Sequence, residues 1–222
     1  MRDTMNNSTE LIEIDIRQSI IDACISMNAL HINQGTSGNI SVRFGEGILI
    51  TPTSMPYKTM TPEDIVWMGF DGQIVGNRAP SSEWNFHMEI MRRKPEVNAV
   101  VHAHPTACTT LSIMEKEIPP IHYMVAVCGG HNIRCAPYAT FGVSQLSENA
   151  LQALEGRSAC LLAHHGMIAT AASLDKALWL AVEVETLAKQ YLGCLSMGEP
   201  PLLSEEEIQN VINRMSGYGH AD

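Results

Sequence analysis

Apolar residues recur at intervals of three and four along residues 9–31, which predicts an amphipathic helix with one buried stripe. The stripe consists of Ile16, Ile20, Ala23, Met27 and Leu30. The spacing also predicts a helix over residues 82–93, which Pro95 stops. A longer amphipathic helix is expected after Ser173, with an apolar face made of Leu174, Leu178, Ala181, Leu187 and Tyr191.

Two further helices are indicated by their ends. Ser144 or Ser147 can begin a helix that ends near Gly156. Ser204 and Glu207 have the spacing of a capping box, which predicts a short last helix that ends near Gly217.

Short β-rich segments lie between these helices. Two pairs of them predict hairpins: 40–44 with 47–52, around Gly45, and 65–70 with 73–76, around Asp71-Gly72. Three more segments predict single strands: 99–104, 132–138 and 159–169. Because strands and helices alternate without a linker or a repeat, we expect a single α/β domain: a central, mostly antiparallel β-sheet flanked by helices.

The composition excludes several classes of protein. The 222 residues carry 14 basic and 24 acidic side chains, for a net charge of -10, which argues against a nucleic-acid partner. No apolar stretch has the length of a membrane span, about 18 residues, so no membrane partner is expected. The six cysteines are scattered, without a CxxC pair, which favours a reducing, cytoplasmic compartment.

Histidines carry the clearest chemistry. His102 and His104 stand two residues apart on a predicted strand, so both imidazoles point to one face and could form half of a metal site. A pair of half-exposed strand histidines is the alternative. Of the adjacent His164 and His165, only one can join them, because neighbouring strand residues point to opposite faces.

Hydroxyl-rich turns are candidates for binding an anion. Ser81 and Ser82 stand where a helix begins, so their hydroxyls and backbone N–H groups suit a phosphate, and Glu83 could act as a base or a metal ligand. Ordinary helix capping explains the same residues. The loop GTSGN (35–39) and the turn ITPTS (50–54) can offer further donors, although a tight turn explains the glycines equally well.

Seven motifs follow one another in a characteristic order: GTSGNISVR, LITPTS, PSSEWNFH, VVHAH, PPIHYM, CAPYATFG and LLAHHG. In this combination the sequence resembles the class II, zinc-dependent aldolase family, above all the L-fuculose-1-phosphate aldolases, and less closely the L-ribulose-5-phosphate 4-epimerases. The resemblance implies a domain over residues 9–218, between a flexible tail (1–8) and a C-terminal tail (219–222). It also implies a homotetramer with fourfold symmetry and active sites at subunit interfaces.

The motifs also imply roles for individual residues. His102, His104 and His165 would ligate one Zn2+ per subunit, with Mn2+ or Co2+ as alternatives. Glu83 would be the catalytic acid and base, and Tyr123 would reach a neighbouring subunit's site. The substrate-binding positions implied are Gly38 (through its backbone), Asn39, Thr53, Ser54, Ser81 and Ser82 for the phosphate, and Phe141 near the aldehyde.

The reaction implied is the retro-aldol cleavage of a small phosphorylated sugar, a 1-phosphorylated ketose, to dihydroxyacetone phosphate and an aldehyde. Two departures bear on the substrate. Ser54 stands where these aldolases usually have glycine, and Met215 stands where they often have an aromatic residue, although Tyr218 is kept. A flexible, apolar methionine suits a tail less polar than that of fuculose, such as a 5-deoxy- or 5-methylthio-ribulose 1-phosphate.

Two other functions use the same scaffold. One is a methylthioribulose-1-phosphate dehydratase or a ribulose-5-phosphate 4-epimerase. The other is a non-catalytic interaction module of the adducin-head type. Such modules lose the metal histidines, whereas His102, His104 and His165 are all present here, together with Glu83.

Overall fold

One mixed sheet forms the centre of the computed structural model, which describes residues 2–215, with side chains from residue 10 onwards. Within that range the sheet has eight strands, in the order β4-β3-β2-β1-β5-β8-β7-β6. The strands are β1 (Asn39–Phe44), β2 (Gly47–Ile50), β3 (Val66–Gly69), β4 (Ile74–Val75), β5 (Ala99–Ala103), β6 (Cys135–Ala136), β7 (Ala159–Leu162) and β8 (Gly166–Ala171). Only β6 and β7 pair in parallel, so the predicted mostly antiparallel sheet is confirmed.

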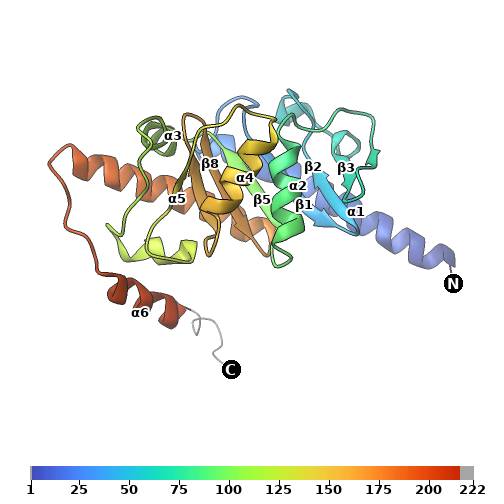
Figure 1. The fold of residues 1–222 in the computed structure, drawn as a ribbon. Coiled ribbons are helices and arrows are strands. Elements are labelled where there is room, and N and C mark those ends of the chain that lie inside the picture. The colour runs from blue at the N-terminus through green and yellow to red at the C-terminus, as the bar shows by residue number, and fades with distance from the viewer. Residues whose placement is uncertain (1, 216–222) are drawn as a thin grey trace.

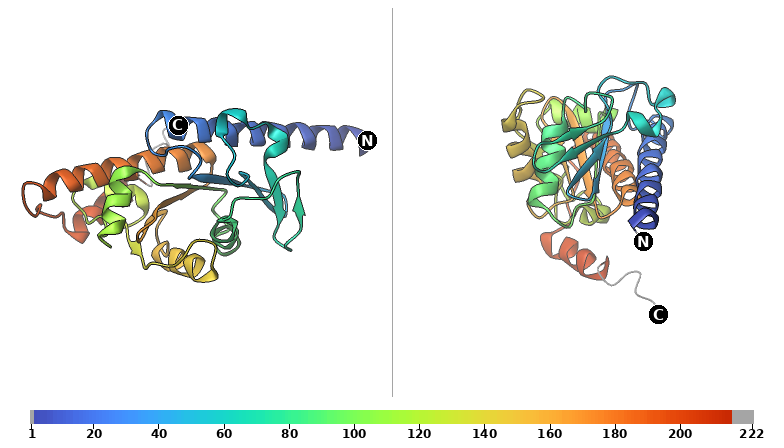
Figure 2. Two further views of the ribbon diagram at one scale, coloured as in Figure 1. Left: turned by 90° about the horizontal axis from the view of Figure 1, so that it is seen from above. Right: turned by 90° about the vertical axis from the view of Figure 1, so that its right-hand side faces the viewer.

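Helices cover both faces of this sheet (Figures 1 and 2). They are α1 (Arg2–Ala29), α2 (Trp84–Arg93), α3 (Thr106–Ile113), α4 (Ser144–Ala153), α5 (Leu174–Leu195) and α6 (Glu205–Met215), with 3-10 turns η1 (Tyr57–Thr59), η2 (Pro62–Asp64) and η3 (Tyr123–Cys128). Helices α1 and α5 lie on one face and α2 and α4 on the other, as Figure 2 shows. The predicted α/β domain is confirmed, and no described helix has the length and apolarity needed to cross a membrane.

Alternation along the strands separates two cores. In β5, Val101 packs in the core under α1 and α5, while Val100 packs in the core under α2 and α4. Because side chains two residues apart share a face, His102 belongs to the α2 side of the sheet. This alternation places His102 on the face of the sheet that α2 covers.

Several predicted elements are confirmed. Both hairpins form, as the pairs β1–β2 and β3–β4. Ser173 accepts a hydrogen bond from the backbone N–H of Lys176 at the start of α5. Ser204 and Glu207 exchange the hydrogen bonds of a capping box before α6. The predicted end of that helix near Gly217, and the C-terminal tail 219–222, lie outside the described residues.

The single strand predicted over 159–169 is wrong. The chain instead forms β7 and β8, which pair antiparallel around a tight turn at residues 163–165. Both strands are buried and apolar, so they read as one continuous run in the sequence. His164 has a positive φ of 56°, an uncommon conformation for a residue other than glycine, and this reverses the chain.

The first helix also differs from its prediction. It begins at Arg2 instead of residue 9. The segment predicted as a tail over residues 1–8 is therefore helical from Arg2 onwards, and its flexibility stays a prediction. The helix ends at Ala29, and Leu30, predicted on its buried stripe, is half exposed. Ile20, Ala23 and Met27 of the same stripe are buried as predicted.

Helix α3 was not predicted, and it begins directly after His104 and Pro105. Its sequence, TACTTLSI, has three threonines and no apolar periodicity. Tertiary structure provides its cap: the buried carboxylate of Glu185, on α5, accepts the backbone N–H groups of Ala107 and Cys108 at 3.1 and 2.9 Å. An anion at a helix N-terminus stabilises it, so α5 fixes the chain that leaves the histidine strand.

Candidate metal centre

Four side chains from three parts of the fold converge on one point. His102 lies on β5, His104 directly follows that strand, His165 lies in the β7–β8 turn, and Glu83 directly precedes α2. One ligand atom from each lies within 4.8 Å of the others. His102 is completely buried and Glu83 nearly so. The two histidines of the HxH motif are thus brought together with one member of the His-His pair.

The histidine rings are oriented by the backbone. His102 donates from Nδ1 to the carbonyl oxygen of Met167, on the neighbouring strand β8, at 2.9 Å. Its Nε2 is therefore unprotonated in the neutral ring and lies 2.9 Å from Nε2 of His104. A hydrogen bond from the far ring nitrogen to a carbonyl is typical of metal-binding histidines, because it fixes the tautomer.

The electrostatics favour the neutral form of His104. Burial, together with the nearby His102 and His165, lowers the pKa of His104 to about 3. At neutral pH its imidazole therefore keeps a free lone pair, which is the form that binds a metal ion. Three imidazoles with room for a fourth ligand are typical of a catalytic rather than a structural zinc site.

The carboxylate of Glu83 is held at the edge of this cluster. Its Oε2 accepts a hydrogen bond from Asn39 Nδ2 at 2.8 Å and lies 3.2 Å from His102 Nε2. Burial opposes ionisation, but His102 and His165 outweigh it and hold the pKa of Glu83 well below its usual range. Its Oε1 lies 3.0 Å from His165 Nε2 without a well-directed hydrogen bond, so one buried carboxylate oxygen lacks a hydrogen-bond partner.

The turn between β7 and β8 decides which histidine of the pair joins the cluster. His165 is half-buried and faces Glu83, whereas His164 is exposed and contacts Glu115 at 3.2 Å. The prediction that only one of the two would join is confirmed, but its reason was wrong. The positive φ of His164, and not strand alternation, separates the two side chains.

The hydroxyl-rich turns form one continuous rim. Backbone bonds join the turn 51–54 to the segment 79–82, from Thr53 N to Ala79 O at 3.1 Å and from Ser81 N to Thr51 O at 2.9 Å. Thr53, Ser54 and Ser82 are exposed, and Ser81 is buried. The four hydroxyl-bearing residues predicted to bind phosphate are thereby gathered beside Glu83, at the start of α2.

Gly38 brings the GTSGN loop against the histidine strand. A Cβ on Gly38 would lie 2.8 Å from the carbonyl oxygen of His102, closer than a side chain tolerates. Buried Tyr57 donates from its hydroxyl to the Gly38 carbonyl at 2.6 Å, and Asn33 donates to the Tyr57 hydroxyl at 3.3 Å. A role for Tyr57 and Asn33 was not predicted, because nothing in the sequence around them distinguishes them from ordinary loop residues.

The remaining predicted positions differ in location. Phe141 is exposed. Its neighbour Gly142 lies close to Ser82, since a Cβ built on Gly142 would be 3.5 Å from the Ser82 carbonyl oxygen. The loop that carries Phe141 is therefore beside the rim. Tyr123 is half exposed on η3 and borders a separate hollow of about 430 Å3 with Met124, Val211, Arg214 and Met215. None of the cluster residues lines that hollow.

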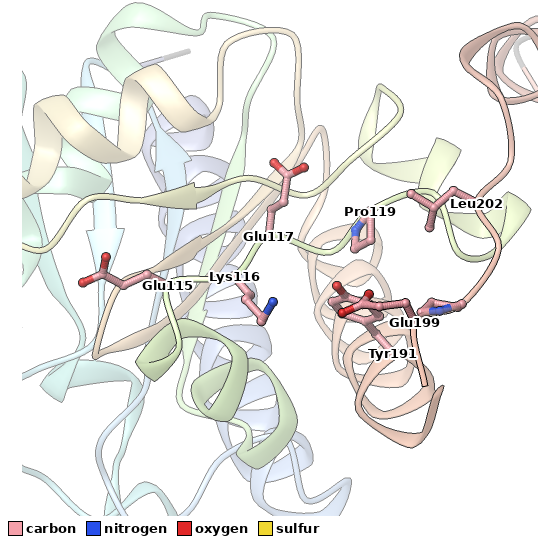
Figure 3. A pocket seen from close by; sticks show the side chains of 8 residues that line it. Glu115, Lys116, Glu117, Pro119, Tyr191, Glu199 and Leu202 are labelled. Atoms are coloured by element: carbon pink, nitrogen blue, oxygen red, sulfur yellow. The ribbon is translucent and has the colours of Figure 1, made fainter. Parts of the chain in front are cut away.

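Another hollow, of about 370 Å3, lies between the segment after α3 and the end of α5 (Figure 3). Its lining residues are Glu115, Lys116, Glu117, Pro119, Tyr191, Glu199, Pro200 and Leu202. Three carboxylates against one ammonium group would repel a phosphate. This hollow therefore does not suit an anionic substrate.

Comparison with known proteins agrees with the geometry. Residues 18–192 match the family described as the class II aldolase and adducin N-terminal domain. The chain is 50% identical to the L-fuculose phosphate aldolase of Escherichia coli strain K12, over 92% of this chain and 95% of the relative. It is 49% identical to the 5-methylthioribulose-1-phosphate/5-deoxyribulose-1-phosphate aldolase of Rhodospirillum rubrum, over 93% of each. A solved L-fuculose 1-phosphate aldolase superposes with a TM-score of 0.88, at 36% identity, covering 91% of this chain and 96% of that one.

Proposed function

Because the chain belongs to the class II aldolase and adducin N-terminal domain family, we propose that it is a metal-dependent lyase that cleaves a 1-phosphorylated ketose. The products are dihydroxyacetone phosphate and an aldehyde. The observation that carries this proposal is the convergence of three histidines and one glutamate within 4.8 Å, beside a rim of hydroxyl groups. A metal site next to a phosphate site suits the retro-aldol cleavage of a phosphorylated ketose.

The metal proposed is zinc, one ion per subunit, held by His102, His104 and His165. Two features of the cluster support the fit: the bond to Met167 leaves Nε2 of His102 free, and Oε1 of Glu83 is buried without a hydrogen bond. Imidazole nitrogens also suit Mn2+ and Co2+, which remain alternatives. When bound, the ion supplies a Lewis acid for the negative charge that cleavage leaves on the three-carbon product.

Glu83 is assigned the proton transfer at carbon. Cleavage breaks the bond between C3 and C4, and the electron pair stays with the three-carbon fragment that carries the phosphate. As the aldehyde forms, the C4 hydroxyl loses a proton, and the three-carbon fragment gains one at C3. Glu83 takes up a proton and passes it to C3, and in the reverse direction its carboxylate removes that proton from C3. Its carboxylate suits the role because it is buried beside the residues proposed to hold the metal and is oriented by the hydrogen bond from Asn39.

The phosphate is assigned to the rim. Its donors would be the Gly38 backbone and the side chains of Asn39, Thr53, Ser54, Ser81 and Ser82. None of these groups is a lysine or an arginine, so the net charge of -10 does not oppose an anionic substrate. The N-terminus of α2 adds a favourable dipole at the same place.

Tyr123 is assigned to the active site of a neighbouring subunit in a homotetramer. It lines a different hollow from the cluster and is half exposed, so it is accessible to a second copy of the chain. In the condensation direction its hydroxyl would protonate the aldehyde oxygen, and Phe141 would border the aldehyde. A phenolic hydroxyl can donate a proton, which suits this position.

The substrate is proposed to be a 5-deoxy- or 5-methylthio-ribulose 1-phosphate, in which the aldehyde portion carries the less polar tail. Relatives with each specificity match the chain about equally, at 50% and 49% identity. Met215 lines the hollow beside Tyr123, and a thioether side chain favours an apolar tail over the polar carbons of fuculose. Tyr218, the aromatic residue kept near Met215 in the sequence, lies outside the described residues. The cytoplasmic compartment stays a prediction from the cysteine pattern.

A panel of ketose 1-phosphates tests this function. Purified enzyme is loaded with zinc and given L-fuculose 1-phosphate, 5-deoxyribulose 1-phosphate or 5-methylthioribulose 1-phosphate, and dihydroxyacetone phosphate is measured with a coupled assay. Release of this product separates an aldolase from a dehydratase or an epimerase, which leave the carbon chain intact. Much faster cleavage of fuculose 1-phosphate than of both other substrates would contradict the proposed tail.

A further inference from the structure

A chain of buried hydrogen bonds leads from the catalytic carboxylate into the protein interior. Glu83 accepts from Asn39 Nδ2 at 2.8 Å, Asn39 Oδ1 lies 2.5 Å from His87 Nε2, and His87 Nδ1 lies 2.7 Å from Ser41 Oγ. His87 and Ser41 are completely buried, and Asn39 nearly so. No water is needed to complete the chain, because each polar atom meets the next one directly.

The secondary structure places these residues in line. Glu83 and His87 are four residues apart at the start of α2, so they share one face of the helix. Asn39 and Ser41 are two residues apart on β1, so they share one face of the strand. Asn39 pairs directly with His102 across β1 and β5, which sets the chain against the metal cluster.

Proton positions along the chain follow from elementary chemistry. An ionised Glu83 can only accept, so Asn39 must present its NH2 group to it and its oxygen to His87. His87 must then donate from Nε2, which leaves Nδ1 as an acceptor for the Ser41 hydroxyl. His87 is completely buried, and this burial lowers the pKa of His87 to about 3, so its ring is neutral, as this pattern requires.

We infer that His87 is a positioning residue for Glu83, which it orients through Asn39 with Ser41 as the last donor. The inference rests on the proposed function, because it concerns the proton transfer assigned to Glu83. A flipped Asn39 amide would turn its oxygen towards the Glu83 carboxylate and its NH2 group towards the ring. His87 prevents this flip by offering an N–H that only an oxygen can accept.

Phe86 makes the arrangement rigid. Its ring stacks on His87, with centroids 4.6 Å apart, and meets His102 edge-on at 5.3 Å. Ring motion of His87 is therefore limited on the side towards the metal ligands. The carboxylate of Glu83 is thus held, through Asn39, by His87, Ser41 and Phe86, which are all buried.

The test is exchange of the C3 proton of dihydroxyacetone phosphate with D2O, which isolates the step assigned to Glu83 because no aldehyde is present. In His87→Phe, which keeps a flat ring without nitrogens, we expect exchange to fall about 10–100-fold, as when a hydrogen-bonded partner behind a metal site is lost. His87→Gln restores an N–H near the position of Nε2 and should recover most of the rate. Ser41→Ala, a milder change, should give a rate between wild type and His87→Phe.

Three measurements separate positioning from folding. Zinc content and thermal unfolding should stay close to wild type in His87→Gln and Ser41→Ala, and Met88→Leu, a buried neighbour on α2, serves as the control for packing. In the metal-free wild type, 15N NMR should show the Nε2–H tautomer of His87. An Nδ1–H tautomer, unchanged exchange in His87→Phe, or equal losses in the Phe and Gln variants would each overturn the inference. Absence of exchange in the wild-type enzyme would instead contradict the proposed function.

Discussion

His102 and Met167 are joined across the strands β5 and β8 by a 2.9 Å hydrogen bond from the imidazole Nδ1 to the backbone carbonyl oxygen. The acceptor is main chain, so the sheet itself sets the tautomer and the direction of the ring. His102 Nε2 consequently faces His104 and Glu83 in any state in which the sheet is intact. Three testable predictions concern this centre; a fourth concerns Tyr123 and a fifth the phosphate rim.

The first prediction concerns the metal. Treatment with a strong chelator should abolish release of dihydroxyacetone phosphate, and added zinc should restore it, because the Lewis acid is lost and regained. Circular dichroism should change little, since two hydrophobic cores hold the fold independently of the cluster. Retention of full activity in chelated protein that contains no zinc, manganese or cobalt would contradict the proposal.

The adjacent histidines provide a matched pair of variants. His165→Ala should lower the zinc content and reduce turnover. The loss should exceed the factor of roughly 10–100 that is typical when a hydrogen-bond partner of a metal ligand is removed, because His165 is itself proposed as a ligand. His164→Ala should leave both close to wild type, because His164 is exposed and contacts Glu115. The measurements are metal analysis per chain and kcat. Equal losses in the two variants would show that the turn, and not the ligand, was disturbed.

Glu83 should be needed for turnover and dispensable for the metal. Glu83→Gln keeps the size of the side chain and removes the base, so kcat should fall by about 10²–10⁴-fold while zinc remains bound. Glu89→Gln, on the same helix and paired with Arg92, is the control and should keep its activity. An active Glu83→Gln enzyme would remove Glu83 from the mechanism.

Tyr123 should act on a neighbouring subunit. Tyr123→Phe should slow cleavage without changing the mass of the oligomer in solution. Equal amounts of Glu83→Gln and Tyr123→Phe chains, unfolded and refolded together, should regain about a quarter of wild-type activity, since that share of interfaces combines two intact residues. Activity that stays at the level of the two separate variants would place Tyr123 outside the shared site.

Ser54 should carry backbone strain in the phosphate rim. Its φ of 55° lies in the left-handed region, where a Cβ is unfavourable. Ser54→Gly should therefore raise the free energy of unfolding by up to about 1 kcal/mol, the relief of strain being partly offset by the greater freedom of glycine when unfolded. Ser54→Ala keeps the Cβ and should not stabilise the protein. Urea unfolding of the three proteins compares them, and a Gly variant less stable than the Ala variant would refute the strain.

Local patterns in the sequence were sufficient for most elements and for half of the metal centre. The two-residue spacing of His102 and His104 put both rings on one side of a strand, because strand side chains alternate. Apolar periodicity and capping residues located α5 and α6, where local and tertiary preferences agree. Helix α3 was missed because its cap, Glu185, comes from a helix more than seventy residues further along the chain.

The sequence by itself determined the kinds of residue available: imidazoles for a metal, a glutamate for a proton, and hydroxyls for a phosphate. The resemblance of their motifs to a known family predicted an aldolase. The match to the class II aldolase domain and to an L-fuculose phosphate aldolase supports this prediction. Only the tertiary structure decided that His165 rather than His164 faces the cluster, because a positive φ in a tight turn is not encoded in an apolar pattern. It also decided that His87 and Ser41 stand behind Glu83, because helix and strand periodicities locate faces, whereas packing alone determines which faces meet.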